Sequence, residues 1–119
     1  MDNITTLKEL MDIVNTFCEE RDWAQFHTPK DLAIGISTEA NELLQIFRFK
    51  TKDEINQLIN SCRKREIEEE LADVLYFVLR FAHLYDIDLS ASIKNKIKRN
   101  EEKYPIEKVK GSNKKYNEY

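Results

Sequence analysis

The chain has 119 residues, of which 41% are hydrophobic and 34% are charged. This length is enough for one compact domain and too short for two ordinary ones. The formal net charge is −3 at pH 7 and the lysines are scattered among acids, so the basic surface that binds DNA or RNA is missing and a nucleic-acid polymer is not an expected partner.

The first half of the chain predicts two long helices, because few glycines and prolines interrupt it. Apolar residues recur with helical period over residues 5–21, which indicates a first amphipathic helix. A second is expected from residue 29 to about residue 49, since Thr28 suits the N-cap, Pro29 the first helical position and Asp31 the first turn.

The second half predicts two or three more helices, and the fold class is therefore an all-α bundle of four to five helices. Thr51 followed by Glu54 forms a capping-box pattern, which indicates a short connecting helix. The longest and most apolar helix is expected over residues 63–85, and Asp86 or Asp88 can cap a fifth that ends before Pro105. Residues 1–105 are expected to form the domain, and residues 106–119, which lack periodicity, a C-terminal tail.

The cysteines and the N-terminus indicate a cytoplasmic protein. Cys18 and Cys62 lie far apart, without a CxxC pair or a histidine at metal-binding spacing, as is typical of reduced thiols. The N-terminal residues lack a basic start, and no stretch of about 18 apolar residues occurs. We therefore expect neither a signal peptide nor a membrane partner.

Two glutamates of the second helix lie beside its apolar face rather than on its solvated back. At about 100° per residue, Glu39 falls between Ile46 and Leu32, and Glu42 lies at the same border. Because three residues separate them, the two carboxylates point in the same direction.

The fourth helix repeats this pattern. Glu70 falls between Phe81 and Phe77, inside the apolar face, and Asp73 lies at its edge. This face is wide for a chain of this size, so part of it is expected to contact another copy.

Carboxylates that point toward protein need compensation by protonation, by pairing with Arg or Lys, or by a cation. The inward-facing basic residues of these two helices do not match the acids in number, and we interpret the cluster as a site for a hard divalent cation, Mg²⁺ being favoured. Mg²⁺ commonly binds a few carboxylates together with substrate phosphates, which indicates phosphate chemistry. The alternative is that each acid only marks the solvent border of its helix. The acids concerned are Glu39, Glu42, Glu70 and Asp73.

Two further groups are candidates for substrate contacts. Trp23 and His27 lie between two helices, where an aromatic ring can stack on a base and an imidazole can donate a hydrogen bond. A plug in the core is the alternative for Trp23. Lys96, Asn100 and Lys103 share one face of the fifth helix, which is either a solvated face or a phosphate-binding one.

The two acid pairs on core helices resemble the MazG-like superfamily of all-α nucleoside triphosphate pyrophosphohydrolases, which also includes dimeric dUTPases. The likeness to its dCTP pyrophosphatase branch covers about residues 17–116, nearly the whole chain. The segments that carry it are "RDWAQFHTPKDLAIGISTEANELLQIF", "EEELADVLYFVL", "RNEEKYP" and "GSNKKY".

This resemblance implies hydrolysis of a nucleoside triphosphate, such as dCTP or a modified dCTP, to the monophosphate and pyrophosphate. It also implies Mg²⁺ as cofactor, a homo-oligomer that is commonly a tetramer built from dimers, and a role in cleaning the nucleotide pool. The four acids match the family's metal ligands, and Glu39 or Glu42 would orient or deprotonate the attacking water. Positions that match base, sugar and phosphate contacts are Trp23, His27, Lys96, Asn100, Lys103, Tyr104, Lys115 and Tyr116.

The chain departs from the dCTP branch at two aromatic positions. Phe49 stands where that branch usually has tryptophan and is therefore a further expected substrate contact. Phe77, with Tyr76 beside it, stands where a tyrosine is often found. Because the four acids do not read the base, a dUTPase-like pyrophosphatase is an alternative, as is a non-catalytic helical module that binds a nucleotide or a partner.

Overall fold

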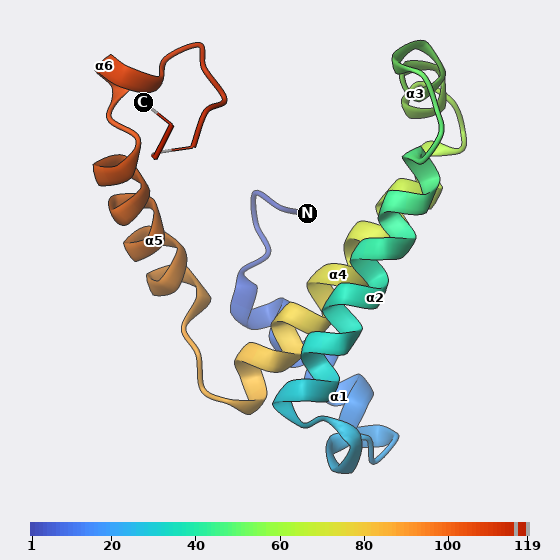
Figure 1. The fold of residues 1–119 in the computed structure, drawn as a ribbon. Helices are drawn as coiled ribbons and strands as arrows, with labels where there is room; N and C mark the ends of the chain where they lie inside the picture. Colours follow the sequence, from blue (N-terminus) through green and yellow to red (C-terminus); the bar gives the residue numbers. More distant parts are fainter. Residues whose placement is uncertain (116, 119) are drawn as a thin grey trace. The chain divides into compact units, whose positions relative to one another are not determined.

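The computed structural model describes residues 1–115, 117 and 118 (Figure 1). All regular elements within these residues are helices, so the predicted all-α class is confirmed. None of the helices in this described part is long and apolar enough to cross a membrane. The chain divides into two compact units, Met1–Tyr85 and the residues from Asp86 onward.

The first unit is built around a pair of antiparallel helices. Helices α2 and α4 lie side by side, with α3 at the end where the chain turns from one to the other (Figure 1). Helix α1 packs against the C-terminal half of α4, where the Cys18 Sγ lies 3.0 Å from the Tyr76 hydroxyl. The elements are α1 (Leu7–Glu20), the 3₁₀ helix η1 (Ala24–Phe26), α2 (Pro29–Phe47), α3 (Lys52–Ile59) and α4 (Lys64–Leu84).

The predicted helix starts are confirmed by their caps. The Thr28 hydroxyl accepts a hydrogen bond from the Asp31 backbone N–H at 3.2 Å, and the Asp31 carboxylate accepts from the Thr28 backbone N–H, which completes a capping box. Thr51 and Glu54 form the same arrangement at the start of α3. Each box satisfies backbone donors that the first helical turn leaves without partners.

The buried face of α2 is narrower than the sequence predicts. Leu32 is fully buried and Ile36 partly buried, whereas Ala33, Ala40 and Leu44, which the helical angles place in the same apolar arc, are exposed. The reason is that α2 packs mainly against the single helix α4. A helix with one main neighbour buries only a narrow stripe of its own surface.

This stripe contains a charged residue. The covered or partly covered positions follow the helical repeat, and Glu39 falls among them rather than at their edge. These positions of α2 are Leu32, Gly35, Ile36, Glu39, Leu43, Ile46 and Phe47.

The second unit contains α5 (Leu89–Lys103), which begins where the sequence predicts. Of the two candidate caps, Asp88 is the one used, and its carboxylate accepts a hydrogen bond from the Ala91 backbone N–H at 2.9 Å. After Pro105 the chain forms the short helix α6 (Ile106–Val109), in a stretch expected to lack regular structure. Pro105 ends α5 and also serves as the N-cap of α6, because its restricted φ of −64° suits the entry to a helix.

A glycine allows α2 and α4 to approach closely beside the acid pairs. A Cβ built on Gly35 would lie 2.5 Å from Cε1 and 2.6 Å from Cδ1 of the Phe77 ring. Gly35 lies one turn before Glu39 on α2, and Phe77 lies one turn after Asp73 on α4. This contact therefore helps to set the separation of the two helices where they carry their carboxylates.

We expect Gly35→Ala to lower the free energy of unfolding by about 1–2 kcal/mol. Overpacking costs about 1–3 kcal/mol, and the better helix propensity of alanine returns at most about 1 kcal/mol. Urea denaturation measures the difference. Ser37→Ala, at an exposed position of α2, is the matched control and should not destabilise. A Gly35→Ala protein as stable as wild type would contradict the tight contact, whereas Phe77→Leu in the same chain should restore stability.

Candidate metal and nucleotide site

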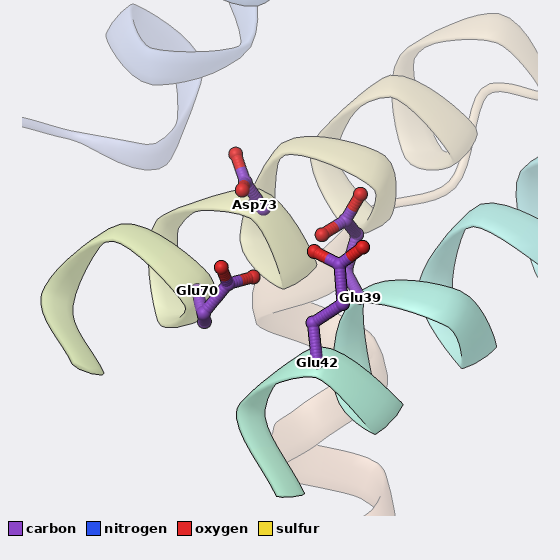
Figure 2. A group of neighbouring side chains, drawn as sticks. All are labelled: Glu39, Glu42, Glu70 and Asp73. Atoms are coloured by element: carbon purple, nitrogen blue, oxygen red, sulfur yellow. The ribbon is translucent and has the colours of Figure 1, made fainter. Parts of the chain in front are cut away.

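Four carboxylates from two helices meet in the first unit. Glu39 and Glu42 extend from α2 and Glu70 and Asp73 from α4, and the two pairs face each other across the helix contact (Figure 2). One carboxylate oxygen of each lies within 4.8 Å of those of the other three. Glu39 and Glu70 are partly buried, and Glu42 and Asp73 are exposed. The structure thus brings together the four acids that the sequence singled out.

These charges repel one another strongly. Two carboxylates about 4 Å apart interact by about 1 kcal/mol in bulk water and by roughly 4 kcal/mol near a protein surface. A hydrogen bond with the Glu42 carboxyl raises the pKa of Glu39 to about 7, and burial and the neighbouring charges act in the same direction. The pKa of Glu70 is also raised, mainly by burial and in addition by the hydrogen bond with Glu42. Without a cation, the cluster therefore retains a proton near neutral pH.

Basic side chains do not neutralise the cluster. The ion pairs within the described residues join Lys8 to Asp12, Arg63 to Glu66, and Arg65 to Glu69, and none involves the four clustered acids. Of the compensations considered above, pairing with Arg or Lys is thus excluded for the described part of the chain.

Two oxygens of the cluster are buried without any hydrogen-bond partner among the described residues. They are Oε2 of Glu39 and Oε2 of Glu70, one from each helix. A buried polar atom that lacks a partner costs free energy, and a carboxylate oxygen can only accept. Hard divalent cations prefer such oxygen ligands, so the donor set fits a divalent metal.

Trp23 and His27 flank η1 in the connection between α1 and α2. Their ring centroids are 6.5 Å apart with an interplanar angle of 72°, and the Tyr85 hydroxyl donates to the His27 carbonyl oxygen at 3.0 Å. The Trp23 ring also lies edge-on to Phe17 at 5.5 Å. Trp23 remains 37% exposed, so it is not a simple core plug and keeps ring surface available to a ligand.

Phe49 does not belong to α2, which ends two residues earlier than expected. It lies just beyond the C-cap residue Arg48 and has a φ of +65°, a left-handed conformation that bulky residues rarely adopt. The side chain is 90% exposed, and the Arg48 guanidinium carbon lies 4.5 Å from the ring centroid. The aromatic ring is therefore held on the surface of the first unit by the end of the helix.

The remaining predicted contacts belong to the second unit. Lys96, Asn100 and Lys103 follow one another along α5 at the spacing of one helix face, and Tyr104 is its C-cap residue. The Lys115 backbone N–H donates to the Glu118 carboxylate. Tyr116 lies outside the described residues. Their roles as substrate contacts stay predictions.

The sequence reasoning missed Arg80, which is 1% exposed and is the buried charged residue of the described chain. Its Nε donates to Nδ1 of His27 at 3.1 Å, and its Nη1 donates to Oδ1 of Asn15 at 2.6 Å. A signal was available, because Arg80 is the one Asp, Glu, Lys or Arg between Asp73 and Asp86.

The described helices and the acid cluster together make an all-α chain with a four-carboxylate site suited to a divalent cation. Residues 34–119 match the MazG-like family. The chain belongs to the MazG-like family.

The chain is also similar to several pyrophosphatases. The chain is 34% identical over 114 residues to human dCTP pyrophosphatase 1, covering 95% of this chain and 67% of that protein. It is 33% identical over 112 residues to bovine dCTP pyrophosphatase 1, covering 93% and 66%. The chain thus spans about two thirds of the length of these mammalian relatives. A crystal structure of a pyrophosphatase from Archaeoglobus fulgidus DSM 4304 aligns with a TM-score of 0.78 and 42% identity, covering 83% of this chain and 92% of that one.

We expect the metal-free protein to lose stability as the pH rises from about 5 to about 8. A carboxyl whose pKa is raised on folding stabilises the fold below its unfolded pKa of 4.5, and this contribution is lost as the pH rises through the folded value of about 7. Thermal unfolding in EDTA at several pH values measures the slope, and Glu39→Gln should flatten it. Glu68→Gln, at an exposed position of α4, should leave it unchanged. An unaltered slope in Glu39→Gln would show that Glu39 does not bind the proton.

Proposed function

We propose that this protein is a Mg²⁺-dependent pyrophosphohydrolase that converts dCTP, or a modified dCTP, to the monophosphate and pyrophosphate. The observation that carries the proposal is the cluster of four carboxylates with one buried, unpartnered oxygen from each helix. Such a cluster can bind a divalent cation together with the phosphates of a substrate.

The enzyme class rests on the family and the relatives. The chain belongs to the MazG-like family, and it is similar over most of its length to mammalian dCTP pyrophosphatases. It is accordingly a nucleoside triphosphate pyrophosphohydrolase. Mg²⁺ as the ion and dCTP as the nucleotide are the finer parts of the proposal.

The four acids would hold the cation, and one of them would also act on water. Glu39, Glu42, Glu70 and Asp73 are the proposed ligands. A bound Mg²⁺ supplies Lewis-acid polarisation of the phosphoryl oxygens. Glu42 or Glu39 orients or deprotonates the attacking water, which is the main task left to a side chain when phosphoryl transfer depends on positioning and charge stabilisation.

Aromatic and basic residues would bind the nucleotide. Trp23, His27 and Phe49 are proposed for the base and the sugar, and the exposure of Trp23 and Phe49 supports a role for both rings in stacking. The proposed contacts from the second unit, to phosphate and sugar, are Lys96, Asn100, Lys103, Tyr104, Lys115 and Tyr116. Residues 1–105 are proposed to form the catalytic domain and residues 106–119 its tail.

We also propose that the protein acts as a homo-oligomer, a tetramer built from two dimers, that cleans the nucleotide pool in the cytoplasm. Leu71 and Leu75 of α4 are 52% and 40% exposed in the single chain, although helical angles place both on the apolar face of that helix. Ile34 and Leu44 of α2 are 52% and 56% exposed. Apolar side chains of this size on the two central helices favour contact with a second copy.

A panel of nucleotides tests the substrate. Purified protein with Mg²⁺ should release pyrophosphate from dCTP or 5-modified dCTP faster than from the other dNTPs and from the NTPs. A preference for dUTP would indicate the dUTPase-like alternative. Folded protein that turns over no nucleotide, yet binds a non-hydrolysable dCTP analogue in calorimetry, would indicate a non-catalytic binding module and contradict the proposal.

Substitution of the clustered acids tests the metal site. We expect Glu39→Gln and Asp73→Asn to abolish activity and leave the helical circular dichroism unchanged, because each removes a charge and not a packing group. Mg²⁺ at 100 times its Kd should stabilise wild type by about 2.7 kcal/mol and stabilise these variants less. Glu68→Gln is the control for a lost charge on α4. Full activity in both variants would exclude the metal-site assignment.

A further inference from the structure

Arg80 is buried without a carboxylate. It is 1% exposed, and its two partners, His27 and Asn15, are both neutral acceptors. Its Nη2 is buried and has no partner among the described residues. An uncompensated buried guanidinium destabilises a fold relative to a well-packed apolar side chain. Packing alone therefore gives no reason for an arginine at this position.

The contact with His27 determines where the imidazole carries its proton. A guanidinium has only donors and stays charged in proteins, so the Nδ1 atom that faces Arg80 Nε at 3.1 Å must be an unprotonated acceptor. The single proton of the neutral ring then resides on Nε2. Burial and the Arg80 charge lower the pKa of His27, while Asp31, at the start of α2, acts in the opposite direction.

The backbone and the ring of His27 also have neighbours that fix their position. The Tyr85 hydroxyl fixes its backbone carbonyl from the C-cap of α4, and the Trp23 ring lies beside the imidazole. Asn15, the neighbour from α1, accepts from Arg80 and not from the imidazole. None of the described residues accepts a hydrogen bond from Nε2, so this N–H is available to a ligand.

We propose that Arg80 is a positioning residue that fixes His27 as an Nε2–H donor for a hydrogen-bond acceptor of the bound nucleoside. This inference rests on the proposed function, in which His27 contacts base or sugar. The acceptor is a carbonyl or ring nitrogen of the base, or a sugar oxygen. Without Arg80 the ring can take the other tautomer, and Nε2 then becomes an acceptor that repels the same group.

The tautomer can be measured without substrate. Two-bond ¹⁵N–¹H correlation spectra of histidine-labelled protein report the protonation of each ring nitrogen, and His83→Gln identifies the signals of the other histidine. We expect Nε2–H with bare Nδ1 for His27 in wild type from about pH 8 to below its ordinary pKa of 6.5. Arg80→Met should give mixed tautomers and protonation at higher pH. A wild-type ring with its proton on Nδ1, or freely mixed, would overturn the proposal whether or not any variant folds.

Steady-state kinetics test the functional consequence, by comparing the KM and kcat of wild type with those of Arg80 variants. Arg80→Met should raise KM for the preferred nucleotide about tenfold and change kcat by less than about twofold, because a contact equally strong in the ground and transition states is lost. Arg80→Lys, which keeps a charged donor, should recover part of the loss. Arg65→Met, on the exposed side of α4, is the matched control and should leave both the His27 spectrum and KM unchanged.

A sugar-modified substrate identifies the acceptor. If Nε2–H donates to the base or to the ring oxygen of the sugar, Arg80→Met should weaken the binding of dCTP and of 2′,3′-dideoxy-CTP equally. If it reads the 3′ oxygen, only dCTP should be affected. A changed tautomer in Arg80→Met with unchanged KM for both would overturn the positioning role. Failure of wild type to hydrolyse any nucleotide would refute the proposed function alone, since the spectra still test the Arg80–His27 contact.

Discussion

Four carboxylates repel one another at the α2–α4 contact, and this repulsion governs the chemistry of the site. Helix contacts are ordinarily apolar, yet here Glu39 occupies a partly covered position of α2 and faces Glu70 of α4. The pKa of both groups is raised, which is the electrostatic sign that the arrangement is unfavourable by itself. The surrounding packing, including the close approach of Gly35 to Phe77, holds the acids together despite this cost.

The arrangement becomes favourable when a ligand neutralises the repulsion among the four carboxylates. A divalent cation converts the repulsion into attraction, because each oxygen that was too close to another becomes a ligand of the same ion. The same apolar contacts that hold the carboxylates would therefore preorganise the proposed cation site.

Arg80 presents the opposite case at the other end of α4. Its positive charge is buried among neutral acceptors, and no carboxylate of the described residues pairs with it. One helix thus carries a negative cluster near its start and a buried positive group near its end. The first suits a cation with phosphates, and the second orders an imidazole next to an exposed tryptophan. A nucleotide has phosphates at one end, which suit the first group, and a base at the other, which suits the second.

The helices and the placement of the acids on them could be predicted from local sequence patterns. Threonine caps, helical periodicity and the scarcity of glycine and proline specify local structure through short-range interactions, and the predicted starts of α2 and α3 were confirmed. The spacing of Glu39, Glu42, Glu70 and Asp73 fixed their directions on each helix, since that depends only on the 3.6-residue turn.

The contacts between distant side chains depend on how the helices pack. The exposure of Ala33 and Leu44 depends on how many helices pack around α2, and a single helical wheel contains no such information. The Arg80–His27 and Arg80–Asn15 contacts join residues 53 and 65 positions apart, and the left-handed backbone of Phe49 arises where α2 ends. Periodicity describes one helix at a time, whereas contacts between distant residues follow from the packing of all of them.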